Sequence, residues 1–142
     1  MAALLRRFGR DARANAAVEF ALIAPVFVMT LIGMVDYGQA ARQKSQLEAA
    51  ARAGLQAVLE DDTDTIGARD AAQAVAPDAS VAVATECECN TGSSVACNGT
   101  CTTGAVRKWV TVTASDSFQL LVPWPGFEDP LPLEGVARAR VQ

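Results

Sequence analysis

Residues 20–35 read FALIAPVFVMTLIGMV and contain no charged side chain. With the preceding residues NAAVE, the stretch 15–35 carries one charge, Glu19, over about 31 Å of helix at about 1.5 Å per residue. This length matches the roughly 30 Å hydrocarbon core of a bilayer. The stretch therefore predicts a membrane-spanning helix, which we assign to residues 15–36.

The charges on either side of this stretch predict its orientation. Residues 1–13 hold four arginines and one aspartate, whereas the rest of the chain holds eight basic and fifteen acidic residues. Basic residues stay on the cytoplasmic side of a membrane, so we expect a cytoplasmic N-terminus and an external C-terminus. A cleaved secretory signal shares the basic start and the apolar run. The length of the run and the glutamate inside it favour a lasting anchor.

The helical pattern continues beyond the apolar run. Residues 37–60 are rich in Ala, Gln, Leu and Arg, which are good helix formers. An apolar stripe recurs at helical spacing along them, made of Leu47, Ala51, Leu55, Val58 and Leu59. We therefore expect the membrane helix to continue, without a break, into an amphipathic extension.

The remaining residues, 61–142, predict a small mixed head. A short helix is expected at 65–75, and alternating patterns predict strands at 80–86, 107–118 and 133–141. Residues 122–132 contain four prolines and predict a loop. The fold class is therefore α+β, with the long helix covering one face of a small antiparallel sheet. We expect Val110 and Val112 on the covered face. Trp109, Trp124 and Phe127 could form a surface patch, but in a chain with so few aromatics we expect them in the core.

Four cysteines lie close together, at Cys87, Cys89, Cys97 and Cys101. Their C-x-C-x7-C-x3-C spacing lacks the C-x2-C pairs of structural zinc sites and the C-x-x-C of redox motifs. The predicted external location favours disulfides over both alternatives. Three connectivities are possible. A nested pairing, Cys87–Cys101 outside Cys89–Cys97, closes the loop most simply.

Composition excludes several classes of function. The chain has no histidine, which removes His-based catalytic triads and histidine metal ligands. A formal net charge of −4 argues against binding to nucleic acid. No grouping of Ser, Cys and carboxylate side chains predicts catalysis. We therefore expect a protein that is not an enzyme and that uses no metal or cofactor.

The junction between the basic start and the apolar run carries a family resemblance. The sequence AAVEFALIAPVFVMTLIGMVDYGQ, residues 16–39, resembles the opening of the TadE-like family of pseudopilins, and the likeness extends over residues 13–60. The resemblance implies a pilin-like fold and a role with the Flp (tight adherence) type IV pilus system. It also implies cleavage by a prepilin peptidase between Ala14 and Asn15, with Glu19 and Phe20 at the fifth and sixth positions after the cut. The family usually has glycine before the cut, whereas this chain has Ala14.

Glu19 acquires a physical role under this resemblance. A carboxylate in hydrocarbon costs several kcal/mol unless it is paired. Cleavage would create an α-amino group at Asn15, one helical turn away or on a neighbouring subunit, and pairing would compensate both charges. The alternative is that Glu19 lies near the cytoplasmic interface and reaches water.

The sequence therefore predicts a basic leader (1–14), a transmembrane helix (15–36), its extramembrane continuation (37–60) and a disulfide-bonded periplasmic head (61–142). The resemblance implies a minor pilin or pseudopilin of the bacterial inner membrane that supports pilus biogenesis or a related secretion machine, and that could enter the pilus. Its implied partners are a prepilin peptidase, other pilin-like subunits and the assembly platform. The alternative is an unprocessed, membrane-anchored periplasmic domain that binds another partner.

Overall fold

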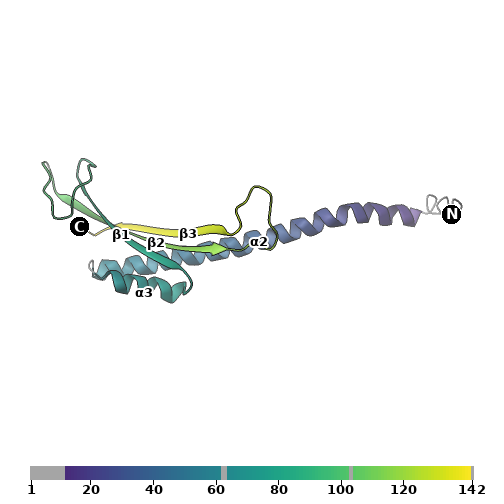
Figure 1. The fold of residues 1–142 in the computed structure, drawn as a ribbon, viewed down its shortest axis with the longest axis horizontal. Coiled ribbons are helices and arrows are strands. Elements are labelled where there is room, and N and C mark those ends of the chain that lie inside the picture. Colours follow the sequence, from purple (N-terminus) through teal and green to yellow (C-terminus); the bar gives the residue numbers. More distant parts are fainter. Residues whose placement is uncertain (1–11, 62–63, 103, 142) are drawn as a thin grey trace. The chain divides into compact units, whose positions relative to one another are not determined.

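The computed structural model describes residues 12–61, 64–102 and 104–141. In these ranges the elements are α2 (Ala12–Glu60), α3 (Thr65–Val75), β1 (Ser80–Cys89), β2 (Val106–Phe118) and β3 (Leu131–Arg140), as Figure 1 shows. The strands form one antiparallel sheet in the order β1-β2-β3. The predicted α+β fold, a long helix with a small antiparallel sheet, is confirmed.

The long helix α2 belongs to both compact units of the chain. It continues without interruption through Pro25, and the division between the units falls inside it, between Gly38 and Gln39. The first unit contributes the apolar part of α2. The second unit, from Gln39 onward, contains the rest of α2, together with α3 and the sheet.

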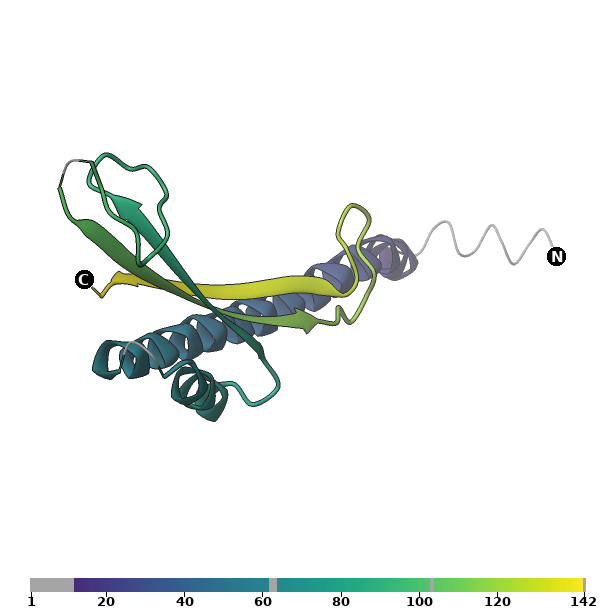
Figure 2. The same ribbon diagram turned by 60° about the vertical axis from the view of Figure 1, so that its left-hand side comes forward.

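The second unit has two layers. The C-terminal part of α2 and the short α3 lie on one face of the sheet, which we call the inner face (Figure 2). Val110 and Val112 of β2 are buried there, as predicted. The predicted stripe also packs inward at Leu47, Ala51, Leu55 and Val58. Leu59 is the exception: it is 56% exposed, although the preceding Val58 is buried against the sheet.

Small residues fill much of this core and let the layers approach closely. Seven of the buried core residues are alanines from the helices, the strands and the connection before β1: Ala50, Ala51, Ala68, Ala72, Ala79, Ala114 and Ala137. At Gly54 of α2, an added Cβ would lie 2.7 Å from the carbonyl oxygen of Ala68 and 3.1 Å from Cγ1 of Val112. Gly54 therefore sets how closely α2 approaches α3 and the sheet.

Contacts along α2 fix the direction of each strand. Gln43, near the start of the second unit, bonds to Asp116 near the end of β2, whereas Gly54 lies against Val112 and Val58 shares a core cluster with Val110. The helix and β2 therefore run in opposite directions. Because β1 and β3 are both antiparallel to β2, they run in the direction of α2.

The short helix agrees with its predicted bounds, and its start has a local cause. Asp64 is the N-cap of α3, and its side chain accepts a hydrogen bond of 2.7 Å from the amide of Gly67. Such a bond satisfies an amide that has no partner within the helix.

The strands differ modestly from their predicted bounds. The first extends to Cys89, and the third begins at Leu131, so Pro132 belongs to β3 rather than to the predicted loop. A proline is tolerated there because β3 is an edge strand.

Trp109, Trp124 and Phe127 are not in the core, so that prediction is wrong. Trp109 lies on the sheet face opposite Val110, since neighbouring side chains of a strand alternate between faces. Trp124 is half-buried in the loop after β2, and Phe127 in the same loop is 66% exposed. The core is built instead from alanine, valine and leucine.

Candidate functional site

The apolar segment of α2 is the most distinctive surface of the first unit. Large hydrophobic side chains are exposed all around it, including Phe20 at 72%, and its most apolar 18-residue window is 0% buried. By length and composition this helix can cross a membrane. Exposed apolar side chains on every face suit a helix surrounded by lipid or by other helices.

The predicted cleavage residues lie at the beginning of this helix. The backbone at Ala14 and Asn15 is already helical, in the first turn of α2, and the preceding residues 1–11 of the leader lie outside the described part of the chain. Glu19 and Phe20 follow on the exposed surface of the helix. Glu19 is four positions after Asn15, and residues with this spacing are neighbours on a helix surface.

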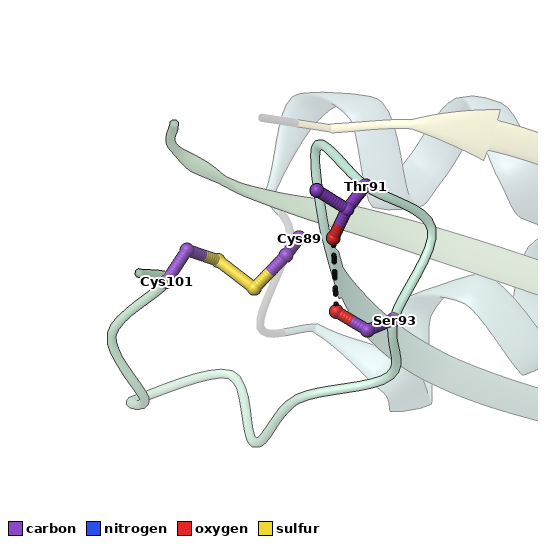
Figure 3. The surroundings of a disulfide bond; sticks show 4 residues. All are labelled: Cys89, Thr91, Ser93 and Cys101. Carbon is purple, nitrogen blue, oxygen red and sulfur yellow. Dashed lines mark hydrogen bonds between the residues drawn. A yellow bond between two sulfur atoms is a disulfide. The ribbon is translucent and has the colours of Figure 1, made fainter. Parts of the chain in front are cut away.

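The cysteines form two disulfides, Cys87–Cys97 and Cys89–Cys101. Figure 3 shows the second of these beside the loop that follows β1. Both bridges hold this loop to the end of β1, where the half-cystines Cys87 and Cys89 are buried. Disulfides are therefore present as expected, but the nested pairing is wrong.

The path of the loop explains the pairing. The chain turns after Cys89, where the amide of Gly92 donates to the Cys89 carbonyl at 2.8 Å, and Gly92 has a positive φ of 83°. Residues 93–95 then run back along β1, so that the amide of Cys89 donates to Ser93 and that of Val95 to Cys87. This return brings Cys97 to Cys87. The chain must then turn again, which brings Cys101 to Cys89.

A polar cluster lies on the outer face of the sheet, opposite α2 and α3. The indole Nε1 of Trp109 donates to Glu88 Oε1 at 2.8 Å, and the guanidinium of Arg138 lies 4.9 Å from the centre of the Trp109 ring. Arg138 also contacts Glu86, with 3.2 Å between Nη2 and Oε2. Beside these residues, under the disulfide loop, is a hollow of about 450 Å³.

Sequence reasoning placed Glu86, Trp109 and Arg138 on strands, ended the first strand before Glu88, and did not bring these residues together. Alternation along β2 puts Trp109 on the face opposite Val110 and Val112, but it does not show that Arg138 of β3 shares that face. The sequence also did not predict the register of the strands. Glu86 and Arg140 both pair with Trp109, and this follows only from the strand pairing in the sheet. The outer face therefore carries acid on β1 and base on β3, at matching heights.

A second hollow, of about 520 Å³, lies between α2 and the C-terminal end of α3. At its edge Gln43 Nε2 donates to Asp116 Oδ2 at 2.6 Å. Its lining combines amide and charged side chains with nearly as many apolar ones, and it contains no nucleophile beside a base. Among the described residues, no group of three or more Cys, Asp or Glu is placed to hold a metal ion.

Comparison with known proteins finds a family likeness in the N-terminal helix. Residues 15–56 match the family model described as TadE-like protein. Searches of the curated proteins and of the solved structures find no match. The matched residues cover the apolar segment of α2 and most of its extension along the sheet. Residues 15–56 of this chain are thus similar to the TadE-like family, and the resemblance drawn from the sequence is confirmed over that range.

Proposed function

We propose that this chain is a minor pilin or pseudopilin that supports biogenesis of a Flp-type (tight adherence) type IV pilus or a related secretion machine. One observation carries the proposal. The TadE-like match falls on a helix whose apolar segment follows an arginine-rich leader and contains Glu19 as its only charge. In this role the helix anchors the protein and packs with other pilin-like subunits, and the α+β unit extends into the periplasm.

Processing is the step that separates this function from a plain anchor. A prepilin peptidase at the cytoplasmic face of the membrane would cut between Ala14 and Asn15 and remove the leader. The new α-amino group at Asn15 would then lie one helical turn from the carboxylate of Glu19. Pairing of these charges would reduce the cost of holding either in a low-dielectric environment, and would fix the axial position of packed helices.

The N-terminal residue of the membrane-purified protein tests the proposal. We expect Asn15 in cells that contain the prepilin peptidase, and Met1 or Ala2 in cells that lack it, as measured by mass spectrometry. Ala14→Leu should block the cut, because a large side chain does not fit beside the scissile bond. Ala12→Leu, two positions upstream, is the matched control and should still be cut. If Met1 or Ala2 is the N-terminal residue under every condition, the protein is not processed, and the alternative of a membrane-anchored periplasmic domain holds.

Orientation is tested separately. The cluster of arginines before the apolar segment supports an N-terminus in the cytoplasm. A reporter that is active only in the periplasm should therefore give signal when it is fused after Gln142. Activity of a cytoplasm-only reporter at the same position would contradict the proposed orientation.

A further inference from the structure

Both edges of the sheet have backbone groups that no strand of the described chain pairs with. At the end of the β2–β3 pair, the amide of Val141 donates to the carbonyl of Lys108. This bond shows which residues of β3 bond to β2 and which have backbone groups that point outward. Odd-numbered residues of β3 therefore bond to β2, and the amides and carbonyls of Glu134, Val136 and Arg138 point away from the sheet. Val136 is also 52% exposed.

The other edge, on β1, is free over a shorter length. Cys87 and Cys89 use their outward backbone groups to bond residues 93–95 of the loop. By the same alternation, the outward groups before them belong to Val81, Val83 and Thr85. On the outer face, Ala82, Ala84 and Glu86 are exposed beside these groups.

The two edges are complementary at equal height. Glu86 and Arg140 both pair with Trp109, and Ala82 and Val136 both pair with Thr113. If the β3 edge of one copy lay beside the β1 edge of the next without stagger, Arg140 would face Glu86 and Val136 would face Ala82. Charge would then meet opposite charge, and an apolar side chain would meet another.

The hydrogen-bonding pattern also fits. In a parallel pair, a residue bonds to the neighbours on either side of the residue that it faces. Val136 would donate to the carbonyl of Val81 and accept from the amide of Val83. Arg138 would do the same with Val83 and Thr85. These are the groups that point outward on β1, so the unstaggered register satisfies both edges.

We infer that a second copy of this chain docks by adding its β1 edge to the β3 edge of the first, in a parallel, head-to-tail arrangement. The parallel orientation follows from the direction of α2. Because β1 and β3 both run with α2, parallel pairing keeps the helices of the two copies in one direction. Antiparallel pairing of two β3 edges would reverse one helix, so two apolar segments could not enter one membrane from the same side. This choice of orientation rests on the proposed membrane anchoring.

Photo-cross-linking of the full chain tests the inference, in a bacterial host that has no other subunit of the system. Glu134→p-benzoylphenylalanine places the probe on β3, and we expect a dimer cross-linked to residues 80–85. Val136→Pro removes an outward amide on β3, and Thr85→Pro removes one on β1. Each alone should reduce the cross-linked dimer at least fivefold. Val136→Ala and Thr85→Ala keep these amides and are the matched controls.

Mixing the two proline variants is the decisive arm, because a head-to-tail contact needs one intact edge of each kind. The Thr85→Pro copy, carrying the probe and an intact β3, should capture a differently tagged Val136→Pro copy. Dimerisation of Thr85→Pro alone would indicate β3–β3 pairing and overturn the inference. So would the absence of a dimer in the wild-type chain, which would leave another protein as the partner of these edges.

A charge exchange repeats the test with exposed side chains that leave the backbone intact. Arg140→Glu should reduce the amount of cross-linked dimer at least threefold, because it places a carboxylate opposite that of Glu86. Mixing it with Glu86→Arg, with the probe on the Arg140→Glu copy, should restore the dimer. Failure of both mixtures to restore the dimer overturns the inference. The proposed processing is tested separately, by the N-terminal residue in cells with and without the prepilin peptidase, so its outcome does not depend on these results.

Discussion

Gly135 of β3 lies against the backbone of α2 at Leu47, in a space that no side chain could occupy. A Cβ on Gly135 would overlap the carbonyl carbon and oxygen of Leu47 and the amide nitrogen of Glu48. Leu47 is itself only 1% exposed and belongs to the main core cluster. The close contact of β3 with α2 therefore depends on the absence of a side chain at one position.

Replacement of this glycine should be costly. Gly135→Ala must push β3 away from α2, and overpacking of this kind costs about 1–3 kcal/mol. We expect the free energy of unfolding to fall by roughly that amount. It can be measured by urea unfolding of the detergent-solubilised chain, followed by the fluorescence of Trp109 and Trp124.

Gly38→Ala is the matched control, because nothing lies within 4 Å of a Cβ built at Gly38. This change should leave stability unaltered or raise it by up to about 1 kcal/mol, since alanine favours helix more than glycine does. If both substitutions changed the free energy of unfolding equally, the contact between Gly135 and Leu47 would not determine how closely β3 packs on α2.

The disulfide pairing predicts which thiol each cysteine variant releases. Cys97→Ser should leave Cys87 open to alkylation without prior reduction, whereas Cys101→Ser should leave Cys89 open. Peptide mapping by mass spectrometry distinguishes them, and alkylation of Cys89 in Cys97→Ser would indicate the nested pairing instead. Loss of either bridge should lower the free energy of unfolding by roughly 2–4 kcal/mol, because each restrains a loop of the unfolded chain.

The cap of α3 gives a smaller and more local prediction. Asp64→Ala removes the acceptor for the amide of Gly67 and should lower the free energy of unfolding by about 1 kcal/mol. Asp64→Asn keeps a side-chain oxygen and should retain most of the stability. The same urea unfolding measures both variants. If Asp64→Asn lowers the free energy of unfolding as much as Asp64→Ala does, the effect comes from the charge of Asp64 rather than from capping.

Glu19 should matter for assembly rather than for cleavage or anchoring. Glu19→Ala removes the carboxylate that we propose compensates the α-amino group at Asn15, so we expect normal processing but loss of co-purification with other pilin-like subunits. Membrane insertion should not weaken, because the change removes a charge from an apolar segment. The measurements are the N-terminal residue, the membrane fraction and affinity capture of tagged protein.

Thr30→Ala provides the control for Glu19→Ala. Thr30 is a polar residue of the same segment whose hydroxyl donates to the carbonyl of Val26 within the helix. It should therefore be replaceable without loss of co-purification. Retention of the partner subunits by Glu19→Ala would remove the assembly role assigned to this carboxylate.

Periodicity along the chain determined the elements. Apolar composition marked the apolar segment of α2 as long enough to cross a membrane, and a helical stripe identified the part of α2 that covers the sheet. Alternation placed Val110 and Val112 on one face of their strand, and the short helix predicted at 65–75 matches α3 to the residue. These features depend on residues within a few positions of one another, so the sequence alone is enough to predict them. The motif around Glu19 likewise lies within one short stretch, which the TadE-like match covers.

Only the tertiary structure decided which distant residues meet. The pairing of Cys87 with Cys97 depends on residues 93–95 folding back along β1, and cysteine spacing is compatible with every connectivity. The need for glycine at 135 arises because Leu47 crosses that point of β3. The matching heights of Glu86 and Arg140 require the register of two strand pairs. Each relationship joins segments far apart in sequence, so its physical cause is long-range packing, which no local pattern specifies.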